Sequence, residues 1–255
     1  AAAVALLAVP VIYLVSRGRL LTIWDEFSHW GTVVKNMYLL DAFGSAPSST
    51  AIFQSYPPSI SLLQYYFMRF EPSFIEATLF RAKDFLTVSL LLPFFAGVTW
   101  KDAKQLLLLP VIVFALPLID YYYFYRCILV DGLMGLLFLY VLASYWDADG
   151  PDVFAFSSLS LGIFALALSK ESGYGFAALA LLIMGAASYS RYMKATTLDV
   201  LGADYLRTAR AKGLTQGRAM RRHGMRMALI PMGQYFAFAV AGAFAGSFFV
   251  ERLFN

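Results

Sequence analysis

Long apolar stretches alternate with short polar breaks along most of the chain. Several stretches approach the roughly 20 residues that a helix needs to cross a bilayer. They lack the period-two alternation of a barrel, and backbone groups in lipid must be paired within the chain, so we expect helices. The pattern predicts an all-α, polytopic integral membrane protein with about seven or eight transmembrane helices. The expected segments lie near 1–16, 57–68, 84–100, 105–120, 127–146, 153–169, 172–189 and 227–250.

Some of these segments carry marks of their own. The second, 57–68, is short and partly polar. The first resembles the apolar core of a signal peptide, but it has no basic start or clear cleavage site, so we interpret it as a first spanning helix. Prolines inside the later stretches are expected to kink them. They are Pro93, Pro110 and Pro117.

Composition supports the membrane assignment. Hydrophobic residues make up 60% of the 255 residues and charged residues only 14%, against about 25% charged residues in soluble domains. Cys127 is the only cysteine, which excludes a disulfide within the chain and a multi-cysteine metal site. The two histidines, His29 and His223, are far apart and have no ligand spacing.

Charge is distributed unevenly. Residues 1–186 hold ten Lys/Arg and thirteen Asp/Glu, a net of −3, and residues 187–255 hold ten and three, a net of +7. The segment 191–226 has nine Lys/Arg against two Asp, and the positive-inside rule places it in the cytoplasm. We expect a helix over 197–214 that stops at Gly213, then a second helix that Thr215 caps. By composition alone, this segment also fits a surface held at anionic lipid.

The order of residues in this segment is specific. "SRYMKATTLDVLGADYLRTARAKGLTQGRAMRRHGMRMALIP" (190–231) closely resembles the coupling-helix region of permease subunits of dipeptide/oligopeptide/nickel ABC importers. "AGAFAGSFFVERLFN" (241–255) resembles the following helix. The resemblance covers about 70 residues and implies a cytoplasmic helix that docks in a groove of the ATPase subunit and transmits its movement to the membrane helices.

The resemblance also implies roles and partners. Ala209, Ala211 and Gly213 would let the helix and its turn pack closely. The basic residues would face the ATPase or lipid headgroups and set the docking register. The partners would be ABC ATPase subunits, a second permease subunit and a solute-binding protein in a bacterial-type cytoplasmic (inner) membrane, with no nucleic acid. This chain would bind no cofactor, because ATP sits on the partner subunit. The basic residues are Arg207, Arg210 and Lys212.

The first part of the chain resembles something else. The segments 22–44, 55–66, 125–140 and 166–176 together look like multi-spanning GT-C-type glycosyltransferases, which use lipid-phosphate-linked sugars. Those enzymes carry an acidic pair in the first external loop and often a Tyr-Pro-Pro segment. The resemblance covers most of residues 1–180 and is looser than that of the coupling region.

In the transferase interpretation, Asp25 and Glu26 are the catalytic pair. One carboxylate would act as general base on an acceptor hydroxyl, and the other would hold a divalent metal such as Mg or Mn. Arg17 or Lys35 would contact the donor phosphate. The simpler alternative is that the acidic pair solvates a loop or caps a helix.

Three further charged residues belong to the same resemblance. Asp131 is costly in an apolar stretch unless it faces protein or water, and it could also be a helix-end residue at the interface. Lys170 and Glu171 are either part of a site or neighbours at a membrane boundary.

The chain therefore looks chimeric, with a polytopic region over 1–180 and a permease-like segment over 181–255, joined somewhere in 172–190. The permease interpretation comes first because its motif is far more specific, and under it the protein is not an enzyme. The alternative is the membrane glycosyltransferase, which is one. A third possibility is an inactive membrane fragment or fusion.

Overall fold

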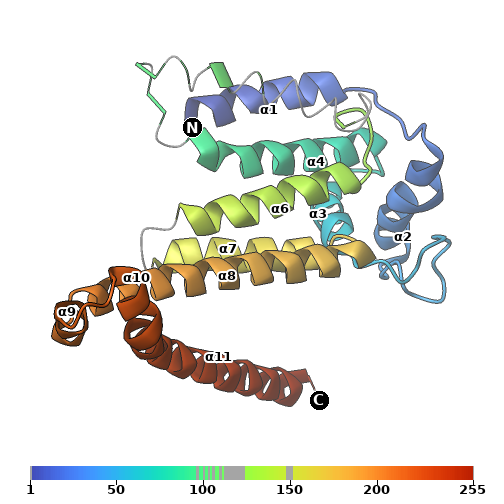
Figure 1. Ribbon diagram of the computed structural model, residues 1–255. Helices are drawn as coiled ribbons and strands as arrows, with labels where there is room; N and C mark the ends of the chain where they lie inside the picture. The colour runs from blue at the N-terminus through green and yellow to red at the C-terminus, as the bar shows by residue number, and fades with distance from the viewer. Residues whose placement is uncertain are drawn as a thin grey trace. The chain divides into compact units, whose positions relative to one another are not determined.

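Every secondary-structure element in the described part of the chain is a helix, which confirms the all-α prediction (Figure 1). The computed structural model describes residues 2–95, 98–99, 101–102, 104, 107–108, 111, 124–147 and 152–254. The chain divides into two compact units, Ala1–Leu181 and Leu182–Asn255, and helix α8 (Glu171–Leu201) runs through the boundary.

The first unit is a bundle of helices around a large apolar core. Helix α1 (Ala2–Ser16) packs along α4 (Glu76–Leu91), which also contacts α3 (Ser59–Met68) and α6 (Asp131–Trp146). Helix α6 in turn packs against α7 (Val153–Ala167). Large buried side chains from these helices and from the segment before α6 fill the core. Among them are Met68, Leu79, Phe80, Phe124, Ile128, Leu133, Leu137 and Leu166.

Helix α4 begins earlier than the apolar pattern predicts. It starts at Glu76 instead of residue 84, because charged side chains in its first half find partners inside the unit. The buried Lys83 ammonium donates to the carbonyl oxygen of Cys127 at 2.9 Å and to that of Phe124. At Pro93 the α-helix gives way to a short 3-10 helix, η2 (Leu92–Phe95), since proline removes a backbone donor and clashes with the preceding turn.

Only α8 is both long and apolar enough to cross a membrane among the residues that the structure describes. Helices α6 and α7 are apolar but shorter. The total of seven or eight spans therefore stays a prediction. Most of the expected segment 105–120, with Pro110 and Pro117, lies outside the described residues.

The segment between α1 and α3 is held by a buried carboxylate. This segment contains a π-helix, η1 (Glu26–Trp30), and helix α2 (Gly31–Leu40), and the carboxylate belongs to Glu26. One oxygen of Glu26 accepts from the backbone N–H groups of Thr22 and Ile23 at 2.9 and 3.0 Å, and the other accepts from that of Ile128 at 2.9 Å. Glu26 thus joins this segment to the chain that leads into α6.

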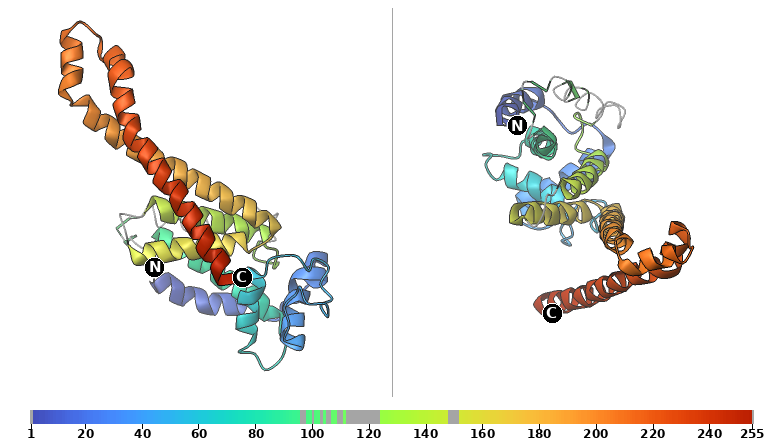
Figure 2. Two further views of the ribbon diagram at one scale, coloured as in Figure 1. Left: turned by 90° about the horizontal axis from the view of Figure 1, so that it is seen from below. Right: turned by 60° about the vertical axis from the view of Figure 1, so that its left-hand side comes forward.

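The second unit is a helical hairpin. After α8 come α9 (Asp204–Ala211), α10 (Gln216–Ala219), the π-helix η3 (Met220–Gly224) and the long α11 (Met225–Phe254) (Figure 2). We expected one helix over 197–214, and this was wrong. The chain breaks at Gly202 and Ala203, where Ala203 adopts an extended conformation and glycine adds little to helix stability.

Candidate coupling site

Helix α9 ends in a tightly closed turn. The N–H of Leu214 donates to the carbonyl oxygen of Ala209 at 3.2 Å, and the N–H of Gly213 donates to that of Arg210 at 2.9 Å. Gly213 has φ +89°. This hydrogen-bond pair with a left-handed glycine is the Schellman motif, which satisfies the last carbonyl groups of a helix.

Beneath the turn lies a small apolar core. Leu206, Ala209 and Ala219 are buried, and partly buried apolar side chains pack against them. Because the two alanines are small, α9 and α10 approach each other closely. The segment that contains α9 and α10 thus has a packed interior of its own, completed by Val200, Leu214 and Met220.

The basic side chains of this segment are exposed to solvent. Arg207, Arg210 and Lys212 are all exposed. Arg207 makes an ion pair with Asp204 at 3.7 Å, and both side chains are largely in solvent, where such pairs contribute little. Tyr205, 40% exposed, adds an aromatic surface to the same helix. The exposed cationic donors thus lie on a helix that is held in place by its buried residues Leu206 and Ala209.

The small residues of this segment differ in their surroundings. Ala209 is buried, whereas Ala211 is exposed. Around Gly213 the space is open, since an added Cβ would meet no atom within 4 Å. Glycine is needed there for the backbone conformation and not for close packing.

Sequence reasoning found one residue of this site in part and missed others. Thr215 occupies the position before α10, and its carbonyl oxygen accepts from the N–H of Ala219 at 2.9 Å, but its side chain makes no capping hydrogen bond. Leu206 and Ala219 were not expected in the core, although the spacing of Leu206 and Ala209 on α9 was a readable signal. Gly224 and Val200 also pack closely, because a Cβ added at Gly224 would lie 3.1 Å from Cγ1 of Val200.

A second polar cluster lies in the first unit, where α6 and α8 begin. The Lys170 ammonium pairs with Asp131 at 2.7 Å, and the Ser55 hydroxyl donates to Glu171 at 2.9 Å. The structure thus brings together the charged residues that the sequence singled out around the α7–α8 turn.

His29 lies near this cluster in a cage of aromatic rings. Its ring meets those of Trp30, Phe53 and Tyr56 edge-on, with centroids 4.7 to 5.4 Å apart. Its Nδ1 accepts from the N–H of Phe53 at 3.4 Å. Burial lowers the pKa of His29 to about 4, with the charge of Asp25 acting against that shift. The ring is therefore neutral at pH 7.

The structure does not favour the glycosyltransferase chemistry that the sequence suggested for Asp25, Glu26, Arg17 and Lys35. Asp25 is exposed, but Glu26 is fully buried and both its oxygens are engaged by backbone N–H groups. Arg17 is exposed, and the Lys35 ammonium lies 5.8 Å from the centroid of the Phe74 ring. Within the described ranges, no three His, Cys, Asp or Glu side chains gather to hold a metal ion.

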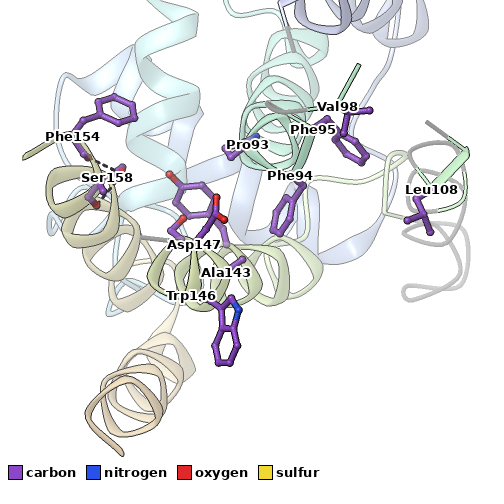
Figure 3. A pocket seen from close by; sticks show the side chains of 13 residues that line it. Pro93, Phe94, Phe95, Val98, Leu108, Ala143, Trp146, Asp147, Phe154 and Ser158 are labelled. Carbon is purple, nitrogen blue, oxygen red and sulfur yellow. Dashed lines mark hydrogen bonds between the residues drawn. The ribbon is translucent and has the colours of Figure 1, made fainter. Parts of the chain in front are cut away.

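An open cavity of about 920 Å³ lies at the far end of α6 (Figure 3). Its walls come from η2, the end of α6 and the start of α7, and they are largely apolar. None of the predicted site residues lines it. The labelled lining residues are Pro93, Phe94, Phe95, Val98, Leu108, Ala143, Trp146, Asp147, Phe154 and Ser158.

Comparison with known proteins decides between the two resemblances. A family described as "Binding-protein-dependent transport system inner membrane component" matches residues 84–255. The chain belongs to this family. The match includes the whole coupling site and runs across the expected junction at 172–190, whereas Arg17, Asp25, Glu26 and Lys35 lie before it.

Individual relatives of this transport-system component are oligopeptide and glutathione permeases. The oligopeptide transport system permease protein OppB of Mycobacterium tuberculosis (strain ATCC 25618 / H37Rv) is 54% identical over 77 residues, 30% of this chain and 24% of the relative. AppB of Bacillus subtilis (strain 168), also an oligopeptide transport system permease protein, is 42% identical over 69 residues, covering 27% and 22%. The glutathione transport system permease protein GsiC of Escherichia coli (strain K12) is 34% identical over 141 residues, or 45% of each chain.

The chain thus spans between 22% and 45% of these relatives' lengths. No solved structure matches it. The resemblance seen in the coupling segment is confirmed by the family match and by these relatives.

Proposed function

We propose that the chain is a permease component of a peptide-class ABC importer and that the module 204–214 couples ATPase movement to solute translocation. The observation that carries this proposal is the closed turn at Gly213. It holds an exposed basic helix in a fixed orientation, and a fixed charged surface suits docking with a defined register.

The substrate and partners follow from the same proposal. The relatives are named for oligopeptide and glutathione transport, so a peptide is the expected solute. An importer of this class needs ATPase subunits, a second permease subunit and a solute-binding protein. The nine Lys/Arg of 191–226 favour the cytoplasmic side for the module. ATP would bind the ATPase, so this chain would need no cofactor.

The glycosyltransferase alternative is not favoured. Its acidic pair precedes the segment that the family match covers. Glu26 already accepts three backbone hydrogen bonds, which leaves its carboxylate little freedom to bind a metal or a proton donor.

The test is co-purification of the tagged full chain with the ATPase subunit of its transporter. Gly213→Val should strongly reduce the amount of ATPase recovered, because a β-branched residue is strained at φ +89°. Gly217→Val is the matched control, since Gly217 is equally exposed, has ordinary helical geometry and is surrounded by open space. It should leave recovery near that of the parent.

A charge variant keeps the test independent of folding. Arg210→Glu reverses one exposed charge and leaves the core of Leu206 and Ala209 intact. It should lower recovery and make the remaining complex less sensitive to added salt. Full recovery with both Gly213→Val and Arg210→Glu would show that the module does not dock the ATPase.

A further inference from the structure

Three tyrosines join the two long helices of the second unit. The ring of Tyr235 on α11 contacts those of Tyr189 and Tyr192 on α8, with centroids 4.9 and 5.3 Å apart. Tyr192 and Tyr235 are 38% and 41% exposed, so the cluster shows aromatic surface on the outside of the hairpin. Aromatic rings with a polar tip are typical of the boundary between membrane and water.

The charge pattern of α8 puts this cluster at such a boundary. Residues 172–190 carry no charged side chain. At about 1.5 Å per residue this stretch is about 28 Å long, close to the hydrocarbon thickness of about 30 Å. The first charges after it are those of Arg191 and Lys194, which are both exposed and lie at the same level along α8 as Tyr189 and Tyr192.

We propose that Tyr189, Tyr192 and Tyr235, together with Arg191 and Lys194, form a binding surface for anionic phospholipid headgroups at the membrane surface. The rings would sit at headgroup depth, and the two cations would meet the phosphates of the lipids. Basic residues at this depth are attracted to an anionic leaflet, and the attraction fades within a Debye length of about 8 Å.

The same geometry separates this surface from the coupling module. The hairpin is also fixed at a second point, where Val200 packs against Gly224. From Tyr192 to Val200 the axis of α8 rises about 12 Å, and from Gly224 to Tyr235 that of α11 rises about 16 Å. The basic residues of α9 lie beyond that second point, more than a Debye length from the headgroups. Lipid therefore binds at the tyrosines and leaves the module free.

The experiment uses the full chain in phosphatidylcholine vesicles with and without phosphatidylglycerol. Spin-labelled lipids report the relative association constant of phosphatidylglycerol. Lys194→Gln should lower this constant about fivefold, the factor expected for one basic residue at an anionic surface. Lys212→Gln removes another exposed lysine, from the coupling turn, and should leave the constant unchanged.

A depth measurement provides a second readout. In a Cys127→Ser background, a nitroxide at Ser190 should collide mainly with oxygen, and one at Leu198 mainly with a water-soluble relaxing agent. Equal losses with Lys194→Gln and Lys212→Gln, no loss with either, or a lipid-buried label at Leu198 would each overturn the proposal. The inference rests on the membrane placement of α8 and not on ATPase docking, so the vesicle result stands whether or not the ATPase co-purifies.

Discussion

At the scale of single residues, Glu26 shows how position decides between chemistry and architecture. Its sequence neighbour Asp25 is exposed and makes no capping hydrogen bond. Glu26 is buried and accepts from three backbone N–H groups. Hydrogen bonds to a charged acceptor are stronger than neutral ones, so this carboxylate fixes the local backbone.

Replacing Glu26 with Gln should therefore destabilise the fold. The amide group brings an NH₂ to positions where the carboxylate accepted hydrogen bonds, which leaves buried donors unpaired at a cost of about 1–3 kcal/mol. The measurement is thermal unfolding in detergent, followed by the reaction of a thiol-specific dye. Cys127 suits this readout because it is the only cysteine and is buried.

Asp25→Asn serves as the control and should leave the unfolding temperature within error of the parent. If Glu26→Gln were as stable as Asp25→Asn, the hydrogen bonds to Thr22, Ile23 and Ile128 would not hold this segment.

At the scale of elements, the turn between α7 and α8 is closed with very little space. Gly173 donates its N–H to the carbonyl oxygen of Lys170 at 2.8 Å, and the Ser169 hydroxyl donates to that of Leu166 at 2.7 Å. A Cβ on Gly173 would lie 2.2 Å from the Leu166 carbonyl oxygen. Backbone atoms cannot move aside cheaply, so only glycine fits. This turn also positions Lys170 for its ion pair with Asp131.

Gly173→Ala should destabilise the first unit by about 1–3 kcal/mol, the usual cost of overpacking. Gly175→Ala lies two residues further along the same helix, in open space, and should be neutral or stabilising because alanine favours helix. The Cys127 unfolding assay compares the two variants. Equal unfolding temperatures would mean that the turn relaxes without cost and that its closeness does not matter.

The elements also show what the sequence could predict. Apolar runs located α1, α6, α7 and the start of α8 well, because side chains that face lipid or core leave a clear pattern, but α8 continues past the expected end at 189 to Leu201. The apolar pattern failed for α4, because the buried Lys83 ammonium is paired by hydrogen bonds inside the unit. It also missed the break at Gly202, because the residues on both sides of that glycine have a helical pattern. At the coupling site, the order of residues identified the family, but the core formed by Leu206 and Ala219 depends on contacts that no single stretch encodes.

At the scale of the whole molecule, the helix connections predict the side of the membrane on which each end of the first unit lies. Lys170 pairs with Asp131, so α7 returns to the level where α6 begins. The charges of Asp25 and Lys170 both act on His29, which puts all of these groups at one end of the first unit. Helix α8 starts at that end and continues into segment 191–226, for which we propose the cytoplasmic side. If α7 crosses the membrane as α8 does, the start of α7 shares the cytoplasmic side with that segment.

Single cysteines in a Cys127→Ser background test this topology in intact cells and in inside-out vesicles. Asp25→Cys should react with a membrane-impermeant maleimide from outside the cell. Val153→Cys, at an 81% exposed position at the start of α7, should react only in inside-out vesicles, as should Lys212→Cys. Opposite sides for Val153 and Lys212 would mean that α7 and the short α6 do not cross the membrane and that only α8 does. Labelling of Asp25 from the cytoplasmic side would instead reverse the first unit, and α8 would then not separate the Lys170 cluster from the coupling module.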